Sequence, residues 1–324
     1  MATVESTAGA QPLAGKRRIR DWLGDRILFV LTLLAALAAI AIMVAIAYKV
    51  FEGAKLSFST FGLSFLTGME WDTVKSVFGA APLLYGTAVT SAIALLIAGP
   101  LGIAIALFLS ELAPRTVRGI VGPLVETLAA VPSVVLGLWG ILVMGPFVGD
   151  HLEPWLHGTF PWFPLFGSTY WGSGLLPAGL ILAIMVVPIV ASICRELFLS
   201  VPSELEDGAL ALGATRWEMV RGVILSSSRP GIAAALILGL GRALGEAIAV
   251  TQVIGSATAI HTSLFPPGDT LASRIAAQFQ GAVTKLQISS LFYLAAILLV
   301  IGLVTNLVAQ LIVRHYDVQR AGAN

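Results

Sequence analysis

The sequence predicts an all-α polytopic membrane protein with six transmembrane helices. Its mean hydropathy is +0.91, 57% of its residues are hydrophobic and only 11% are charged, which excludes an ordinary soluble domain. Several apolar runs reach or exceed the 20 or so residues that an α-helix needs to cross a hydrocarbon core of about 30 Å. The single cysteine, Cys194, excludes an internal disulfide and a cysteine-based metal cluster.

Six apolar segments are the expected membrane spans. They cover residues 27–48, 82–110, 119–148, 174–198, 230–258 and 288–313. The first is too long for the core of a signal peptide and no clear cleavage site follows it. Prolines in the second, third and fourth spans predict kinks, which a membrane tolerates where neighbouring helices satisfy the freed backbone groups.

The spans divide the chain into a separate first helix and a five-helix core. The expected parts are a tail (1–26), a peripheral first transmembrane helix (27–50), an external loop (51–81), a core (82–313) that contains a polar loop (201–229), and a C-terminal tail (314–324). The run 27–48 has no charge, glycine or proline, so it offers little to a polar pathway and is placed outside the core.

The distribution of Lys and Arg predicts the orientation. With six spans and the N-terminus inside, thirteen of the 19 basic residues lie in cytoplasmic segments, five lie outside and Arg242 lies within a span. This excess is the positive-inside pattern. Both termini and the loop 201–229 are therefore expected in the cytoplasm.

The polar loop 201–229 is expected to form two helices outside the bilayer. Pro202 and Ser203 predict a helix start, with Ser203 as the N-cap and Glu206 as its partner in a capping box. The first helix then covers about 204–212.

Gly213 is expected to end that helix. A second helical piece over 216–225 then leads to Pro230, where the fifth span begins. A helix–turn–helix of this length offers a docking surface.

Arg242 and Glu246 are charged residues within an expected span. A charge at the centre of a spanning helix raises the free energy of membrane insertion by about 2.5–3.5 kcal/mol. Counted from Pro230, Arg242 lies about 18 Å into the core, and Glu246 follows one helical turn later. Arg before Glu is the weaker order for an i,i+4 pair. A solvated pathway or partners on another helix therefore explain the two charges better than helix stability does; a buried, helix-orienting salt bridge is the alternative. Gly241 and Gly245 would let a neighbouring helix approach closely.

Glu126 is the third acidic or basic residue of interest, about seven residues into the third span. Three roles are open for its carboxylate. It could accept a hydrogen bond from Arg242 or from an arginine of a partner subunit, or it could reach the cytoplasmic interface. The chain has no phosphate-binding loop of the G-x-x-x-x-G-K-[ST] type and no hydrolase or zinc-protease motif. We therefore expect no enzyme and no metal site.

The polar loop resembles the cytoplasmic coupling loop of ABC-importer permeases. Gly213 matches the glycine of that pattern and Ala209 its second alanine. Asp207 and Gly208 replace Glu-Ala, and Ser226 replaces the proline.

Three further stretches make the resemblance more specific. They are E-T-L-A-A-V-P-S-V-V-L-G-L-W-G at 126–140, M-V-V-P-I-V at 185–190 and G-L-G-R-A-L-G-E-A-I-A-V at 239–250. Together with the loop they resemble phosphate-transport permeases of the PstC type over about residues 80–315.

The resemblance implies a type I ABC importer permease fold and a role as the permease subunit of an ATP-driven phosphate importer in a bacterial cytoplasmic membrane. Partners would be a PstA-type permease, two PstB-type ATPases that bind ATP and Mg, and an external PstS-type phosphate-binding protein; this chain would hold no cofactor. Arg242, Glu246 and Glu126 would belong to the substrate pathway. The residues expected to meet the ATPase are Glu206, Asp207, Ala209, Gly213, Ala214, Thr215 and Trp217, with Ala209, Gly213 and Ala214 small enough for a groove to close on them.

Two other functions compete with this interpretation. A permease for molybdate or sulfate would share the loop but not the stretch 239–250. An ion-gradient-driven transporter would use Glu246 as a proton carrier and would need no ATPase, which the coupling loop argues against.

Overall fold

The computed structural model describes residues 17–321, with side chains described for residues 24–311, and is helical apart from one two-stranded hairpin. Six helical segments among these residues are long and apolar enough to cross a membrane. They are Gly24–Phe61, Ala81–Leu112, Ser133–Thr159, Leu175–Leu199, Arg216–Gly245 and Lys285–Leu311. The all-α, six-span prediction is confirmed.

The chain divides after Val50 into two compact units. The described part of the first unit is one helix, the beginning of α1 (Arg17–Phe61), with apolar residues on all sides as a lipid-facing helix requires. Residues 51–61 of α1 belong to the second unit. The peripheral role of the first helix stays a prediction.

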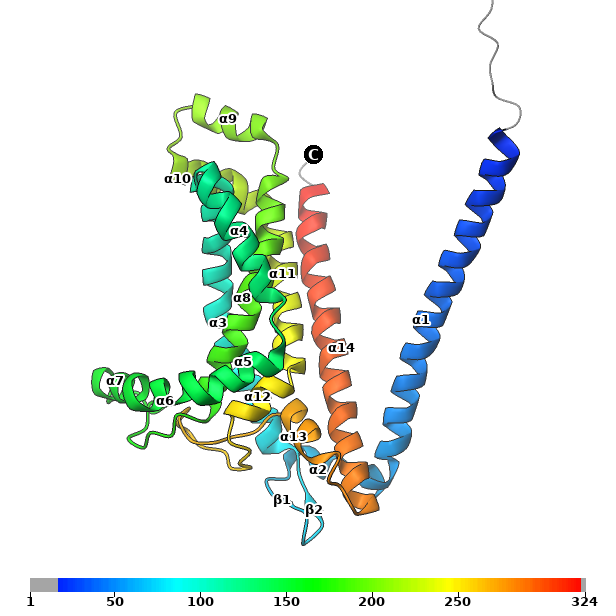
Figure 1. Cartoon of the computed structure of the whole chain (residues 1–324), viewed down its shortest axis with the longest axis vertical. Coiled ribbons are helices and arrows are strands. Elements are labelled where there is room, and N and C mark those ends of the chain that lie inside the picture. The colour runs from blue at the N-terminus through cyan, green and yellow to red at the C-terminus, as the bar shows by residue number, and fades with distance from the viewer. Residues whose placement is uncertain (1–16, 322–324) are drawn as a thin grey trace, which may run out of the picture. The chain divides into compact units, whose positions relative to one another are not determined.

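The second unit is built around α8 (Leu175–Leu199), most of which is buried. The helices α3 (Ala81–Leu107), α11 (Leu225–Gly245) and α14 (Lys285–Ala321) run along it or beside its neighbours (Figure 1). Glycines allow the closest contacts. A Cβ added to Gly102 would lie 2.8 Å from Val190 of α8. Close packing of this kind is what holds helices together where lipid removes the hydrophobic driving force.

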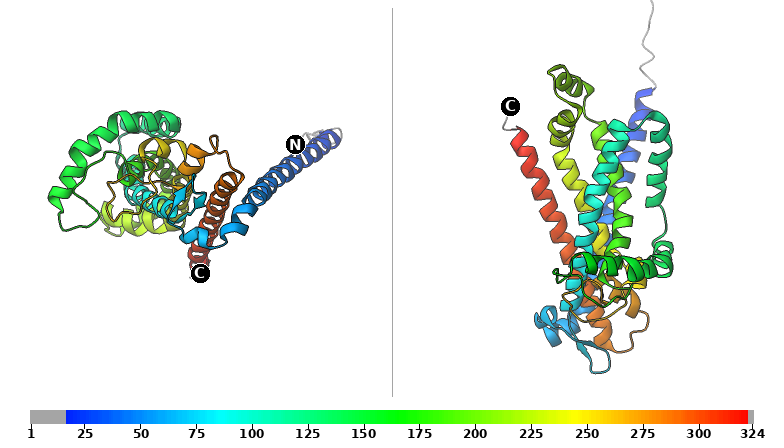
Figure 2. Two further views of the ribbon diagram at one scale, coloured as in Figure 1. Left: turned by 90° about the horizontal axis from the view of Figure 1, so that it is seen from below. Right: turned by 90° about the vertical axis from the view of Figure 1, so that its left-hand side faces the viewer.

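The third span was predicted as one helix over 119–148, and this prediction is wrong. The helix α4 (Arg115–Ala129) ends before Pro132, and the chain restarts in another direction, across α3 and α8, as both views of the second unit show (Figures 1 and 2). This crossing segment consists of α5 (Ser133–Trp139), η2 (Gly140–Met144), α6 (Gly145–Phe147), η3 (Val148–Leu152) and α7 (Glu153–Thr159). Pro132 has extended backbone (φ −59°, ψ 136°), so the α-helix does not continue through it.

Buried contacts hold the crossing segment in place. The backbones of Gly145 and Gly172 touch, because a Cβ on Gly145 would lie 2.7 Å from the Gly172 carbonyl. The fully buried Glu153 carboxylate accepts a hydrogen bond of 2.8 Å from the Trp171 N–H. The loop before α8 is thus fastened to the crossing segment.

At one end of the bundle, α3 passes into the π-helical turn η1 (Phe108–Leu112), and α9 (Ser203–Ala211) and α10 (Arg216–Met219) form a protruding hairpin (Figure 1). The end of α14 lies at the same end of the second unit. This hairpin confirms the predicted helix–turn–helix.

The fifth predicted span is wrong at both of its ends. The helix begins at Arg216, continues through the π-helical turn η4 (Val220–Ile224) and through Pro230, and stops at Gly245. Proline is tolerated here because membrane helices re-satisfy freed backbone groups through their neighbours. The helix stops because Glu246 is extended (φ −70°, ψ 118°), and a short helix, α12 (Ile248–Val253), follows.

The opposite end carries α2 (Ser64–Thr67), the hairpin β1 (Trp71–Asp72) and β2 (Val77–Phe78), and α13 (Leu271–Gln278). The two strands are antiparallel, with Trp71 opposite Phe78. Aromatic rings pack beneath them onto α14, where Phe65 stacks on Tyr293 at 4.4 Å between ring centroids.

The end of α1 is fastened to α14 by small polar side chains. The Ser57 N–H donates to the Ser289 hydroxyl at 2.9 Å, and the hydroxyls of Ser57 and Ser290 lie 3.1 Å apart. Hydrogen bonds between helices satisfy polar groups that would otherwise be unpaired in an apolar environment.

We predict that Gly86→Ala destabilises the second unit. An added Cβ in α3 would lie 1.9 Å from the backbone oxygen of Asp269, which cannot move aside as a flexible side chain would. Overpacking of this kind costs about 1–3 kcal/mol. The midpoint of thermal denaturation in detergent should fall. Gly119→Ala in α4 is the matched control, because nothing lies within 4 Å of its added Cβ; an equal fall in both variants would contradict the packing argument.

Candidate functional site

Arg242 and Glu246 meet at a helix break and not within one helix. Arg242 lies in the last turn of α11, and its Nη2 is 3.2 Å from the Glu246 Oε2. The other carboxylate oxygen of Glu246 accepts from the Ala249 N–H of α12 at 3.2 Å. The sequence placed Glu246 one turn further along a continuous span; instead, its carboxylate joins the two helices across the break.

The two partners have unequal exposure. The Glu246 side chain is 6% exposed and that of Arg242 is 48% exposed. The buried carboxylate has a cation and a backbone N–H, as a buried charge requires. Among the described residues, the guanidinium has no hydrogen bond or ion pair besides Glu246. With five N–H donors, it keeps several for a further partner.

The same face of α11 is open around Arg242. An added Cβ on Gly241 or Gly245 would meet nothing within 4 Å, and Leu238, one turn earlier, is exposed. Small residues on a membrane helix allow another helix to come close. Within this chain, nothing that the structure describes takes that place.

Glu126 has a partner that the sequence analysis did not consider. Its Oε1 is 3.2 Å from Nη1 of Arg195 on α8, so Glu126 does not pair with Arg242. Arg195 lies over Gly122, whose added Cβ would be 3.3 Å from the same Nη1. The pair fastens α4 to α8 at an exposed position, where an ion pair contributes about 0–1 kcal/mol.

The helix caps of the α9–α10 hairpin differ from the prediction. Pro202 is the N-cap of α9 and no side chain caps it, so the expected capping box of Ser203 and Glu206 does not form. A capping box forms instead between Thr215 and Glu218 at the start of α10, because Thr215 has the extended backbone that an N-cap needs.

Gly213 ends α9 as predicted. It has a φ of +88°, in the left-handed region that favours glycine. The Ala214 N–H donates to the Ala209 carbonyl at 3.1 Å and the Gly213 N–H to the Leu210 carbonyl at 3.0 Å. These two bonds are the Schellman motif, which satisfies the last carbonyls of a helix.

The exposed side chains of the hairpin are larger than expected. Leu212 is 92% exposed, and Leu205 and Trp217 are also exposed. Ala209 turns inward and packs on the chain's own core, and Ala214 is half-buried. The surface available to a partner is thus apolar and bulky, with Gly213 open beside it.

Glu206 lies half-buried at the base of the hairpin. Burial raises the pKa of its carboxyl, and the negative charges of Glu111 and Asp207 raise this pKa further. Ionisation of Glu206 therefore opposes the folded hairpin, and this penalty disappears as the pH falls through the raised pKa.

Comparison with known proteins connects these features. Residues 98–318 match the family model "Binding-protein-dependent transport system inner membrane component". "Phosphate transport system permease protein PstC" of Mesorhizobium japonicum is 43% identical over 305 residues, which cover 93% of each chain. The PstC protein of Xylella fastidiosa strain 9a5c is 40% identical over 92% of this chain and 93% of its own. The chain belongs to the PstC family of transport permeases.

Solved structures confirm the fold of this family. A bacterial ABC transporter that imports the polysaccharide alginate has a chain with a TM-score of 0.59 and 19% identity, over 91% of this chain and 99% of that chain. A bacterial alginate ABC transporter, solved in complex with its alginate pentasaccharide-bound periplasmic protein, has a chain with a TM-score of 0.58 and 20% identity, over 92% of this chain and 97% of that chain. The predicted ABC importer permease fold is therefore correct, and the chain is a multi-pass inner-membrane protein.

One buried ion pair of this PstC-family chain was not predicted from the sequence. Nη2 of Arg274 on α13 lies 2.6 Å from the Asp269 Oδ2, and both side chains are buried. The spacing Thr270-x-x-Ser273 was the available signal, because it marks a helix start that would bring a preceding carboxylate over the first turn. From the distribution of charge, Arg274 is only one of the five basic residues expected outside the membrane.

We predict that Thr215→Ala frays the start of α10, because it removes the hydroxyl that accepts from the Glu218 N–H at 3.3 Å. Loss of a threonine N-cap costs about 1 kcal/mol. Amide hydrogen exchange over residues 215–219 should become faster. Ser203→Ala is the control and should leave exchange in α9 unchanged; a larger effect there would mean that the predicted cap exists after all.

Proposed function

We propose that this chain is the transmembrane permease subunit of an ATP-driven importer of inorganic phosphate. The observation that carries the proposal is the Arg242 guanidinium, which is half-exposed at a helix break and has donors to spare. The names of the PstC relatives support phosphate as the substrate.

The chemistry of the Arg242 site suits a phosphate ion. A guanidinium donates two parallel hydrogen bonds to two oxygens of one phosphate and keeps its charge at every physiological pH. Glu246 compensates the charge of Arg242 while the pathway is empty. Because its carboxylate is also held by the Ala249 N–H, it stays in place when the guanidinium turns toward the substrate.

The open face of α11 would be covered by a second permease of the PstA type, so that each subunit supplies half of the pathway. Gly241 and Gly245 leave room for its helix. In this arrangement, Glu126 serves the α4–α8 contact of its own subunit. Glu126 would then not line the substrate pathway, although its position in the sequence favours that role.

Two PstB-type ATPases would bind ATP and Mg, and one of them would dock on the α9–α10 hairpin of this chain. The exposed apolar side chains Leu205, Leu212 and Trp217 supply the contact surface. An external PstS-type protein would deliver phosphate at the other end. The chain itself would hold no cofactor and catalyse no reaction.

Both termini and the hairpin would then lie in the cytoplasm. The excess of Lys and Arg in the corresponding segments supports this orientation. For the C-terminus, so does the location of the end of α14 beside the hairpin in the second unit (Figure 1).

The continuous helix from α10 to α11 offers a direct mechanical link. Arg216–Gly245 is 30 residues long, about 45 Å at 1.5 Å per residue, and runs from the hairpin to Arg242 without a loop. Movement of the hairpin on the ATPase would therefore tilt the helix end that carries the guanidinium. The π-helical turn η4 is a natural flexing point.

We predict that Arg242→Gln abolishes phosphate uptake, because an amide offers hydrogen bonds but no net charge. Arg242→Lys should keep part of the activity, since it retains the charge but loses the paired donors. Uptake of radiolabelled phosphate would be measured in cells at matched amounts of assembled transporter, with molybdate and sulfate as competitors.

The double variant Arg242→Gln/Glu246→Gln separates this role from a helix-orienting salt bridge. If the pair only orients helices, Arg242→Gln leaves the buried Glu246 carboxylate without its cation, at about 3–5 kcal/mol, and lowers the amount of protein. Glu246→Gln leaves a half-exposed guanidinium and should lower the amount of protein less. The double variant would then recover both assembly and uptake. Full uptake in that double variant would refute the substrate role of Arg242.

We predict that Leu212→Glu prevents assembly with the ATPase while the permease still inserts. Leu212 is 92% exposed and contributes little to its own chain, so a charge there should disturb only a docked partner. Co-purification of the ATPase with the tagged permease is the measurement. Val74→Glu is the matched control, equally exposed at the tip of the β1–β2 hairpin. Normal ATPase recovery with Leu212→Glu would contradict the docking surface.

A further inference from the structure

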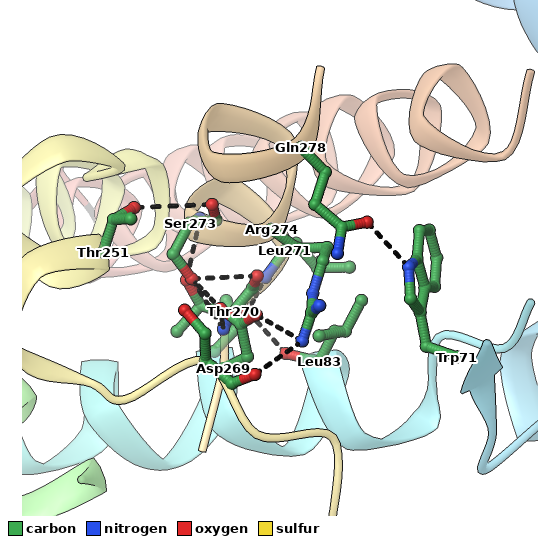
Figure 3. A network of polar contacts seen from close by, with 11 residues as sticks. Trp71, Leu83, Thr251, Asp269, Thr270, Leu271, Ser273, Arg274 and Gln278 are labelled. Atoms are coloured by element: carbon green, nitrogen blue, oxygen red, sulfur yellow. Dashed lines mark hydrogen bonds and ion pairs between the residues drawn. The ribbon is translucent and has the colours of Figure 1, made fainter. Parts of the chain in front are cut away.

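The buried Asp269–Arg274 pair lies in a polar network on the side of the bundle opposite the α9–α10 hairpin (Figure 3). The other carboxylate oxygen of Asp269 accepts from the Thr270 N–H at 2.8 Å and from the Ser273 hydroxyl. Arg274 also donates from Nη2 to the Ser256 carbonyl at 3.2 Å. One guanidinium therefore joins two segments that are eighteen residues apart.

The aromatic face of Trp71 covers the same guanidinium. The Arg274 Cζ lies 5.9 Å from the ring centroid, within the range of a cation–π contact. Trp71 is held in turn, because its Nε1 donates to the Gln278 Oε1 at 2.8 Å, one turn further along α13. The β1–β2 hairpin is thereby tied to the residue that holds Ser256.

Ser256 is the residue at which this network reaches α12. It lies three residues after the end of α12, in a turn where Gly255 has a φ of +84° and Ser256 a φ of +55°. A serine in the left-handed region is unfavourable by itself, so the surroundings must hold it there. Backbone bonds hold the residues on either side of it, from the Gly268 N–H to the Ile254 carbonyl and from the Ala257 N–H to the Gly268 carbonyl. The hydrogen bond from Arg274 is the side-chain contact that holds the Ser256 carbonyl itself.

A second contact connects the network to α12. The Thr251 hydroxyl donates to the Ala247 carbonyl at 2.7 Å and also lies 3.4 Å from the Ser273 carbonyl of α13. The helix α12 has only six residues, between the break at Glu246 and the turn at Ser256. Its position is therefore sensitive to how both of its ends are held.

Stability alone explains the ion pair poorly. A buried salt bridge loses much of its attraction to desolvation, and apolar residues of similar volume often do as well. What an apolar residue cannot supply is the set of contacts that Arg274 makes at one point: a carboxylate, the carbonyl of a left-handed residue and an aromatic face.

We propose that Arg274, held by Asp269, is a positioning residue for the Arg242–Glu246 site. It fixes the end of α12 through Ser256, and α12 carries the Ala249 N–H that the Glu246 carboxylate accepts. Without Arg274, the turn at Ser256 relaxes and α12 moves. Glu246 then no longer holds the guanidinium of Arg242 in its place. The inference rests on the proposed function only for its transport readout.

The test uses a thiol introduced on α12. Ile248→Cys lies at an exposed position beside the helix break, and the native thiol is removed by Cys194→Ala, at a buried site. The rate of maleimide labelling, measured on the complete transporter in membrane vesicles, reports the position of α12 whatever the substrate is. Phosphate uptake per assembled complex is measured in parallel.

Asp269→Asn/Arg274→Gln is the decisive variant, because it leaves no buried charge unpaired. We expect it to assemble, to change the labelling rate several-fold and to lower uptake per complex by about tenfold or more, as small misplacements of functional groups do. Arg274→Lys should change both quantities in the same direction by less. Unchanged labelling and unchanged uptake in the neutral double variant would overturn the proposal.

Two other outcomes are also decisive. If the double variant does not assemble, Arg274→Lys decides alone. Lysine keeps the charge beside Asp269, but its side chain is shorter than that of arginine and has no planar face for Trp71, so its ammonium does not reach the position from which Nη2 donates to Ser256. Parental labelling and uptake in this variant would overturn the proposal. If labelling changes in these variants while no variant or parent transports phosphate, the positioning role stands and the proposed substrate fails.

Discussion

The arrangement of the core depends on the interactions of one side chain, the carboxylate of Glu246. A helix that stops inside a membrane leaves backbone groups without partners, and hydrocarbon offers none. At the break after α11, the Glu246 carboxylate pairs with Arg242 and accepts a hydrogen bond from one of these groups, the Ala249 N–H in the first turn of α12. The charge that this buried acid brings is compensated by a guanidinium that still faces outward. The same carboxylate therefore satisfies a backbone N–H at the break and leaves a cation available.

Close backbone contact explains how the remaining helices are placed around this break. Helices in lipid gain little from burying apolar surface against one another, so they depend on small residues that let backbones meet. Gly137 of α5 lies against Ala249 and Gln252 of α12, and Gly140 of η2 lies against Val253. The crossing segment α5–α7 is thus packed on the short helix that follows Glu246. The chain turns at Pro132, where the backbone is extended, before α5 begins.

The two ends of the second unit use different physical means. The α9–α10 hairpin is held mainly by local bonds, the Schellman turn at Gly213 and the capping box at Thr215, and presents apolar side chains outward. The opposite end is held by long-range contacts, among them the stacked rings of Phe65 and Tyr293 and the buried pair of Asp269 and Arg274. A hairpin stabilised by its own local bonds can move as a unit, whereas the opposite end is held in place by contacts between distant segments.

The sequence by itself determined the all-α class, the six apolar segments, the helix–turn–helix at 201–229 and its end at Gly213. These depend on hydropathy over about 20 residues or on the backbone freedom of one residue, and both are local properties. It also singled out Arg242 and Glu246, because charges in an apolar run stand out. The tertiary structure alone decided that the helix stops between them, that Glu126 pairs with Arg195, and that Arg274 is buried against Asp269. The partner of Glu126 depends on which distant helix packs against α4, and hydropathy does not carry that information. The break before Glu246 and the burial of Arg274 depend on how neighbouring segments pack around them; for Arg274 the sequence offered only the helix start at Thr270.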